Sequence, residues 1–382
     1  MKVIVIGGGI VGLASAYFLA RRGAEVIVCE KGSLGGGSTE RAAGGIRTQF
    51  STPVNVDLSL ASLPTWRSFE ETFGVDIAYR RAGYLFLARD ESTASAFEAS
   101  VEMQNERGAR SEFLAPEAAR AHCPSLRTEP FSAATFSPLD GFADPHLALQ
   151  GFAAGATEAG ADIRTKTAVT DIIPDSGSVC VVADGTRIDA DFAVNAAGPW
   201  AERVGTLAGL DLPIAPKRRQ MLVVDPERSV PETVPLTIDL DRASYFRPER
   251  DGTALVGGHF AVEDPDRDPD AYSQSFDLDW AVEALERAAD VADYFGPASE
   301  IRRGWAGLYA VTPDHHPIIE ESTPGCITAA GFSGHGFQHA PATGQIVTEL
   351  VFEGSASLVD ISNLGSERFD GDDGLTHERN VA

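Results

Sequence analysis

The chain of 382 residues is poor in cysteine, and its four cysteines lie far apart at Cys29, Cys123, Cys180 and Cys326. It contains no CxxC pair and no cysteine–histidine cluster. Zinc sites, iron–sulfur clusters and disulfide frameworks need closely spaced sets of such side chains. The adjacent pair His315-His316 is expected to be structural, because neighbouring side chains on a loop point apart. The sequence therefore predicts no metal site and a reducing, cytoplasmic location.

Lysine is also scarce, because only Lys2, Lys31, Lys166 and Lys217 contribute to the 31 basic residues, against 56 acidic ones and a formal net charge of −25. A surface so negative repels phosphate, which argues against nucleic acid and anionic membrane as partners. The 43% of hydrophobic residues excludes intrinsic disorder. The composition resembles that of proteins from salt-accumulating halophiles, with an ordinary acidic cytosolic enzyme as the alternative.

Long apolar stretches are missing too. The uncharged run that approaches membrane-spanning length, residues 3–20, contains Gly7, Gly8, Gly9 and Gly12. Four glycines do not suit the apolar centre of a signal peptide or of a membrane span. We therefore expect a soluble protein without a transmembrane segment.

That run instead contains a dinucleotide-binding pattern. Residues 2–6 form a β-branched stretch typical of a buried parallel strand, Gly7-x-Gly9-x-x-Gly12 follows, and a helix is predicted up to Gly23. A second predicted strand, residues 25–29, ends at Glu30. In this pattern the glycines allow a tight turn, the approach of a pyrophosphate and close packing of helix on strand, while the acid accepts hydrogen bonds from ribose hydroxyls.

Helices and strands are predicted along the rest of the chain. The helices cover 53–73 with an interruption at Pro64, 91–107, an Asp144-Pro145 start to about 160, 278–292 and 338–352. The strands cover 83–88, 191–198 and 326–330, with a β-rich block over 214–259. The acidic, glycine-containing end from Asp370 is predicted to be frayed.

Five segments, in this order, resemble the FAD-dependent D-amino acid oxidase superfamily. They are residues 7–12, 37–47 (GSTERAAGGIR), 194–200 (VNAAGPW), 312–319 (TPDHHPII) and 331–337 (GFSGHGF). Within the superfamily the chain resembles the branch of sarcosine, dimethylglycine, glycine and L-proline oxidases and dehydrogenases. The resemblance covers nearly the whole chain and is specific to the superfamily, but much less specific to a substrate.

The resemblance implies an α/β fold, with a discontinuous Rossmann-like FAD-binding domain and an inserted β-rich α+β substrate domain. We expect residues 1–82, 143–213 and 303–369 in the FAD-binding domain and residues 83–142 and 214–302 in the substrate domain. Residues 370–382 remain as an acidic tail.

The resemblance also implies where FAD binds. The adenine end is expected at the N-terminal glycines and the ring between the domains, where N–H groups of residues 334–336 would stabilise negative charge at the flavin N1–C2=O edge. The predicted cofactor-binding residues are Gly7, Gly9, Ile10, Val11, Gly12, Glu30, Lys31, Ser38, Thr39, Arg41, Ala43, Gly44, Val169, Ala197, Gly198, Gly334, His335, Gly336 and Gln338.

Three positions depart from the resembling enzymes. Dimethylglycine dehydrogenases attach flavin through a histidine where this chain has Arg41, and monomeric sarcosine oxidases through a cysteine where the alignment places Gly307. We therefore expect non-covalent FAD. The oxidases carry a lysine over the flavin, and a gapped alignment places Leu255 there. Without that cation, superoxide-like charge is less stabilised, which favours a dehydrogenase with an unknown electron acceptor.

The predicted catalytic residues are Arg47, Tyr245, His259, His335 and Gln338. Arg47 aligns with an arginine that binds the substrate carboxylate in sarcosine oxidases, a task that suits the planar fork of a guanidinium. A surface arginine is the alternative. Gln338 replaces a lysine that is the second carboxylate partner there. Tyr245 and His259 align with active-site positions, and buried structural roles are their alternative.

The sequence thus predicts an FAD enzyme that oxidises the C–N bond of a small amino acid or N-methyl amino acid, by hydride transfer from the unprotonated amine to flavin N5. Two alternatives stay open. One is a 2-hydroxyacid dehydrogenase of the same superfamily, although those tend to carry Asn-Ser-Gly where this chain has Ala42-Ala43-Gly44. The other is the flavin subunit of a multi-subunit amine dehydrogenase that needs a partner subunit. An enzyme using NAD alone is disfavoured, because it would have no use for the motif at 331–336.

Charge repulsion predicts that the fold depends on salt. Lowering KCl from ~1 M removes the screening between the 56 acidic side chains, so the melting temperature should fall, with unfolding or loss of flavin. Circular dichroism in a KCl series measures this, with a sucrose series of equal osmolality as the control. A melting temperature that is flat from low to molar KCl would show that the halophile interpretation is wrong.

Overall fold

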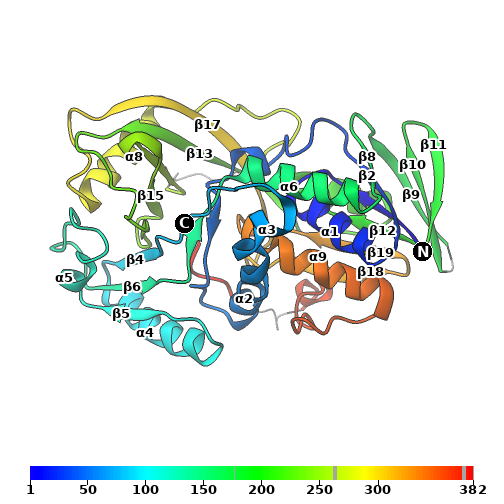
Figure 1. Ribbon diagram of the computed structural model, residues 1–382, viewed down its shortest axis with the longest axis horizontal. Coiled ribbons are helices and arrows are strands. Elements are labelled where there is room, and N and C mark those ends of the chain that lie inside the picture. The colour runs from blue at the N-terminus through cyan, green and yellow to red at the C-terminus, as the bar shows by residue number, and fades with distance from the viewer. Residues whose placement is uncertain (176, 261–264, 372–375, 382) are drawn as a thin grey trace.

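The computed structural model describes residues 1–175, 177–260, 265–371 and 376–381. The chain forms two large β-sheets that lie side by side, each with its own helices (Figure 1). Both sheets draw their strands from several separate stretches of the sequence. This mixed α/β architecture confirms the predicted fold class. No described helix is long and apolar enough to cross a membrane.

The first sheet contains the predicted N-terminal strands. Its order is β18-β19-β12-β1-β2-β8, and all neighbours are parallel except β18 and β19. Its strands are β1 (Lys2–Ile6), β2 (Glu25–Cys29), β8 (Asp162–Arg164), β12 (Phe192–Asn195), β18 (Ile318–Thr323) and β19 (Cys326–Ala330). Alternation along β1 makes both faces apolar, because Val3 and Val5 enter one core and Ile4 and Ile6 the other.

Helices cover the Val3 face of this sheet and a small antiparallel sheet covers the Ile4 face. The helices are α1 (Ile10–Arg21), α6 (Pro145–Glu158) and α9 (Gly336–Glu353), with α2 (Pro53–Arg67) packed on α9 and α3 (Phe69–Phe73) on α6. The small sheet consists of β9 (Val169–Asp175), β10 (Ser178–Ala183) and β11 (Thr186–Ala190). As predicted, Asp144 caps α6, since its carboxylate accepts from the N–H groups of His146 and Leu147.

The second sheet has the order β17-β13-β16-β15-β14-β4-β6-β5. Its strands are β4 (Tyr84–Ala88), β5 (Glu112–Leu114), β6 (Ala133–Ser137), β13 (Ala215–Asp225), β14 (Leu236–Asp239), β15 (Ser244–Pro248), β16 (Ala254–Gly258) and β17 (Glu300–Val311). One face packs on α8 (Leu278–Val291), and the other carries Tyr84, Met221 and Tyr245. β17 crosses the boundary expected at residue 303, and the division into domains stays a prediction.

Shorter elements complete the described part of the chain. They are β3 (Gly45–Ile46), β7 (Gly141–Phe142), α4 (Glu91–Glu106), α5 (Pro116–Ala119), α7 (Ala201–Leu207) and the 3₁₀ turns Thr39–Arg41, Gly198–Trp200, Arg250–Gly252 and Ser366–Phe369. The antiparallel pair β3 and β7 lies at the start of the stretch that leads to Arg47.

The predicted helix interruption at Pro64 is wrong. The helix α2 continues through Pro64 to Arg67, and the break before α3 falls at Ser68. A proline removes one backbone donor from a helix. However, Leu63 and Trp66 on either side of it are 3% and 1% exposed. Their burial in the helical core offsets the missing hydrogen bond.

The predicted frayed end is also wrong for residues 376–381, which the structure describes. Glu378 is 1% and Asn380 is 6% exposed. The Glu378 carboxylate accepts hydrogen bonds from Ser51 and Thr52 at the start of α2. An acidic residue is expected to be exposed, but its carboxylate can be buried where hydrogen-bond donors surround it. The other residues of that end, 372–375 and 382, lie outside the described ranges.

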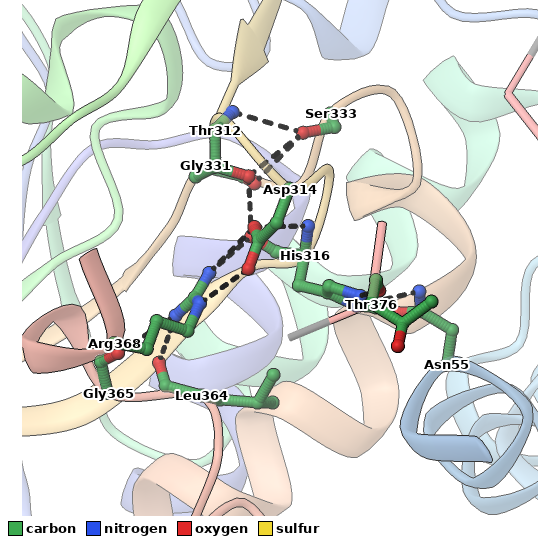
Figure 2. Close-up of polar contacts among 10 residues, drawn as sticks. All are labelled: Asn55, Thr312, Asp314, His316, Gly331, Ser333, Leu364, Gly365, Arg368 and Thr376. Carbon is green, nitrogen blue, oxygen red and sulfur yellow. Dashed lines mark hydrogen bonds and ion pairs between the residues drawn. The ribbon is translucent and has the colours of Figure 1, made fainter. Parts of the chain in front are cut away.

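A nearly buried ion pair holds the 364–369 stretch to the loop after β17 (Figure 2). Arg368 Nε donates to Asp314 Oδ2 at 2.7 Å and Nη2 to Oδ1 at 3.1 Å, and the side chains are 7% and 6% exposed. Burial raises the pKa of Asp314, but the hydrogen bonds from Arg368 and the His316 N–H outweigh it and leave the pKa below its usual value.

Replacing Arg368 by alanine should destabilise the fold, because breaking a buried pair leaves the Asp314 carboxylate without its partner and costs about 3–5 kcal/mol. Urea unfolding at pH 7 measures the free energy. The control is Arg302→Ala, since Arg302 forms an exposed 3.0 Å pair with Asp225, worth about 0–1 kcal/mol. Because folding lowers the pKa of Asp314, the contribution is present above about pH 4 and is lost as the pH falls. Equal losses in the two variants would contradict this account.

Candidate active site

A cavity of about 640 Å³ is lined by residues of both large sheets. Ile6 and Cys29 line it from the carboxyl ends of β1 and β2, and Met221 and Tyr245 line it from the second sheet. The volume lies in the range of small-molecule and cofactor sites. Ligands of open parallel sheets bind outside the carboxyl ends of the strands, which is where this cavity begins.

All the predicted site residues except Gly12 and His259 line this cavity. Gly12 lies behind it, where an added Cβ would stand 2.0 Å from the carbonyl oxygen of Gly7. Gly7 itself has a φ of +112°, a backbone conformation that favours glycine. Gly12 thus allows α1 to pack closely on β1, the task expected of the third glycine in the pattern.

His259 lies behind Tyr309 and not on the cavity wall. The two ring centroids are 5.0 Å apart, and Tyr309 lines the cavity. His259 Nε2 is buried and has no hydrogen-bond partner among the described residues. Burial, with a further contribution from Arg219, lowers the pKa of His259 well below its usual value. The ring is therefore neutral, and it contacts Tyr309 rather than the cavity itself.

The fingerprint end of the cavity has the features needed to hold a pyrophosphate. Helix α1 begins there, and the Ile10 N–H donates to Thr39 Oγ1 at 3.1 Å. The Glu30 carboxylate accepts from the N–H groups of Gly8 at 2.8 Å and Gly32 at 2.7 Å. Glu30 thus fixes the glycine turn and also lines the cavity, next to the position expected for a ribose.

A second helix N-terminus meets the same cavity. Helix α9 begins at Gly336 and lies beside α1 (Figure 1). Gly334 has a φ of +94°, and a Cβ there would stand 2.2 Å from the Tyr309 ring, so the backbone packs directly against a side chain that lines the cavity. Both helix ends favour negative charge. The described residues therefore fit FAD, because its pyrophosphate is anionic and its flavin N1–C2=O edge takes up negative charge when the ring is reduced.

Arg47 is only 6% exposed and lies on the cavity wall, so the surface-arginine alternative is wrong. Its guanidinium donates to the carbonyl oxygens of Gln49 and Asn380. Nη2 also lies 3.1 Å from His335 Nε2, and the backbone N–H donates to Gln338 Oε1 at 2.7 Å. Burial lowers the pKa of Arg47, yet a guanidinium keeps its charge at neutral pH.

His335 is neutral beside this charge. Burial, together with the Arg47 charge, lowers the pKa of His335 well below its usual value. Because arginine can only donate, His335 Nε2 accepts, and the ring proton is on Nδ1. His335 is also the N-cap residue of α9. It therefore contributes no positive charge to the cavity near pH 7.

Several lining residues were missed by sequence reasoning. Tyr84 and Tyr309 face the cavity from β4 and β17, and burial raises the pKa of both phenols. Arg219 and Val381 also line it. The alternation of the β-rich strands could have identified the tyrosines and Arg219, but no sequence signal pointed to Val381.

A cluster of charged residues crosses the wall near the fingerprint end. The Asp270 carboxylate accepts from Trp200 Nε1 at 2.9 Å and from Arg203 Nη1 at 2.8 Å, and it pairs with Lys31. Lys31 Nζ lies 4.0 Å from the Trp200 ring centroid. The three partners of Asp270 all line the cavity, so Asp270 connects them at the edge of the cavity.

Leu255 does not line the cavity, so the alignment that placed it over the flavin is wrong. The register of β13 and β16 places Met221 opposite Gly257, with Leu255 two residues further along the same face. The Tyr245 hydroxyl lies 2.4 Å from where a Gly257 Cβ would be. Met221 and Tyr245 thus form this part of the wall, and the expected slow reaction with oxygen has no basis in Leu255.

The two helix N-termini, the glycine pattern and the cavity between two sheets define a dinucleotide-binding oxidoreductase. A comparison with protein families matches residues 2–350 to the DAO family, described as FAD dependent oxidoreductase, and the chain belongs to this family. The predicted family and the predicted FAD are confirmed.

Known proteins support the same assignment. FAD-dependent oxidoreductase domain-containing protein 1 of Xenopus laevis is 30% identical, over 99% of this chain and 84% of that protein. The structure of L-proline dehydrogenase from P. horikoshii has a TM-score of 0.87 at 32% identity over 97% of both chains. Glycine oxidase from Geobacillus kaustophilus has a TM-score of 0.83 at 26% identity, over 96% of this chain and 98% of that chain. The protein is thus an FAD-dependent oxidoreductase related to glycine- and proline-oxidising enzymes.

Arg41 and Gly307, the two positions that the resemblance relates to covalent flavin attachment, lie against each other. An added Cβ at Gly307 would stand 2.8 Å from the Cβ of Arg41. The Arg41 guanidinium donates to the carbonyl oxygens of Gly36 and Gly37 at 2.6 and 2.9 Å. Cys29, the described cysteine on the wall, is a poor nucleophile because burial raises its pKa to about 11.

FAD should therefore be held without a covalent bond. Acid precipitation of the holoprotein should give a colourless pellet and a yellow supernatant, because neither Arg41 nor Gly307 supplies an attachment atom. The absorbance spectra of both fractions measure this, with a covalent flavoprotein treated in parallel as the control. A pellet that stays yellow would contradict the prediction, and peptide mapping would then locate the bond.

Proposed function

We propose that the protein oxidises the C–N bond of a small amino acid or N-methyl amino acid, of the glycine, proline, sarcosine or dimethylglycine type. The observation that supports this most directly is the buried charge of Arg47 on the cavity wall, close to the N-terminus of α9. A cationic group buried at one end of a pocket selects an anionic substrate of limited size.

Arg47 is the group that would bind the substrate carboxylate. Paired N–H groups of a guanidinium match the two oxygens of a carboxylate, and removal of water strengthens the attraction. Tyr84 and Tyr245 line the same cavity, and burial raises the pKa of both. They remain neutral phenols at pH 7 and do not repel an anion.

The same end of the cavity favours an unprotonated amine. Arg47 and Arg219 both line it, and nearby positive charge lowers the pKa of an ammonium group. An unprotonated nitrogen is needed because its lone pair forms the imine as the C–H bond breaks. When bound, FAD supplies the acceptor for that hydride. The chain itself holds the carboxylate, excludes water and disfavours the ammonium form.

A 2-hydroxyacid fits this site less well than an amino acid. Removing a hydride from an alcohol requires a base that takes the hydroxyl proton. His335, the described histidine on the cavity wall, has a pKa well below its usual value and is a weak base. An amine can instead lose its proton to water before it binds.

A dehydrogenase, with an acceptor other than oxygen, is part of this proposal. Related oxidases have a lysine over the flavin, as the resemblance implies. Lys31 is the lysine on the described cavity wall. It follows Glu30 at the fingerprint end, whereas Arg47 lies beside the start of α9. No described lysine therefore supports charge on oxygen near the α9 end.

Substitution of Arg47 tests the substrate class. Losing one partner of a buried charge pair costs about 2–5 kcal/mol, so kcat/KM of Arg47→Ala should fall by roughly 30-fold to several thousandfold. Arg47→Lys should recover part of the loss, since it keeps the charge but not the fork. An active amino acid is compared with its methyl ester, which lacks the anionic carboxylate.

The ester and the FAD content are the controls. The ester should lose little in either variant, and the flavin spectrum should be unchanged because the fingerprint end is intact. An equal loss for acid and ester, or no loss for either, would remove Arg47 from substrate binding and disprove the amino-acid proposal.

A further inference from the structure

Residues 376–381, here called the wall segment, contribute to the cavity at its Arg47 end. Val381 lines the cavity, and the carbonyl oxygen of Asn380 accepts from Arg47. Figure 2 shows how the segment is fixed at its start, where His316 Nε2 lies 2.9 Å from the Thr376 carbonyl oxygen. Asn55 Nδ2 lies 3.1 Å from the other nitrogen of that ring.

Glu378 is the strongest anchor of the wall segment. Its Oε1 accepts from the Ser51 N–H at 2.8 Å and the Ser51 hydroxyl at 2.7 Å. Its Oε2 accepts from Thr52 Oγ1 at 2.6 Å and Asn55 Nδ2 at 3.1 Å. These donors surround the N-terminus of α2, where partial positive charge favours a carboxylate. With the Asn380 N–H as a fifth donor and a side chain that is 1% exposed, Glu378 is a fixed part of the fold.

Glu378 is connected to Arg47 through Asn380. The Asn380 N–H donates to Glu378 Oε1 at 3.0 Å, while its carbonyl oxygen accepts from Arg47 Nη2. The Arg47 guanidinium carbon lies 4.0 Å from the Phe50 ring centroid, so the ring supports its other side. The direction in which the guanidinium points therefore depends on where Glu378 holds the Asn380 carbonyl.

We propose that the wall segment completes the substrate site, with Glu378 as a positioning residue for Arg47 and Val381 as the residue that limits substrate size. This inference rests on the proposed function and goes beyond it, because it assigns selectivity to residues outside the sheets. Val381 follows the residue that contacts Arg47 and lines the same cavity. A branched side chain there leaves room for short aliphatic amino acids and excludes longer ones.

The test measures binding to the oxidised holoenzyme, so it needs no turnover. Acetate, butyrate and hexanoate are titrated while the change in flavin absorbance is recorded. Glu378→Gln should weaken all three alike, by about 10- to 100-fold, because the guanidinium is no longer held in place. Val381→Ala should improve hexanoate relative to acetate by about tenfold or more, because space is added at the end of the pocket.

Arg379→Ala is the matched control, because Arg379 is an exposed residue of the same segment. It should bind all three carboxylates as the wild type does. Melting temperature and FAD content are measured for every variant. A weaker binding of acetate by Glu378→Gln at unchanged melting temperature and FAD content is the result that separates positioning from general stability. If Glu378→Gln does not fold, the role of the wall segment is judged from the ratio of hexanoate to acetate affinity in Val381→Ala.

The outcomes separate this inference from the proposed function. If only Arg47→Ala loses carboxylate binding, while Glu378→Gln and Val381→Ala behave as wild type, the role of the wall segment is disproved and the proposed function stands. If the wild type binds no carboxylate, or if Arg47→Ala binds them equally well, both are disproved. If either wall-segment variant binds every carboxylate more tightly, the segment competes with the ligand and the positioning role is overturned.

Discussion

The burial of the Arg47 charge is the constraint on which the cavity depends. A guanidinium can leave water only where hydrogen-bond acceptors replace it. Its acceptors come from its own turn at Gln49, from His335 at the start of α9 and from Asn380 in the wall segment, while Gln338 holds its backbone. Because these partners are far apart in sequence, the charge is satisfied only when the turn after β3, the start of α9 and the wall segment are all in place.

The parts of this structure that the sequence predicted are those decided by near neighbours. The buried strand at residues 2–6, the cap at Asp144 and the packing of Gly12 on Gly7 each involve residues a few positions apart. The fingerprint end of the cavity follows from them, because the turn after β1 places the start of α1 beside it. Its residues could therefore be identified before the structure.

The parts that the sequence could not predict are decided by register and by distant partners. Leu255 and Gly257 share one face of β16, yet a step of two residues, roughly 7 Å along a strand, removes Leu255 from the cavity. His259 is also separated from the cavity, in this case by the Tyr309 ring that stands in front of it. Glu378 looked like part of a frayed acidic end because nothing near it in sequence shows that Ser51 and Thr52 will donate to it.

Salt is expected to affect the buried and the exposed charged groups of this protein differently. Among the described residues the buried acids are Asp140, Asp239, Asp314 and Glu378, and each accepts hydrogen bonds inside the fold. The other acidic residues that the structure describes are at least partly exposed, and their mutual repulsion weakens as ions screen it. Buried contacts are screened far less. Molar salt therefore reduces the repulsion between exposed acids without weakening the contacts of Arg47 or the wall segment. Among the ion pairs it weakens the exposed ones, such as those of Asp270 at the edge of the cavity. Since each exposed pair contributes only about 0–1 kcal/mol, screening these pairs costs little stability, and an acidic surface is compatible with a site built on a buried cation.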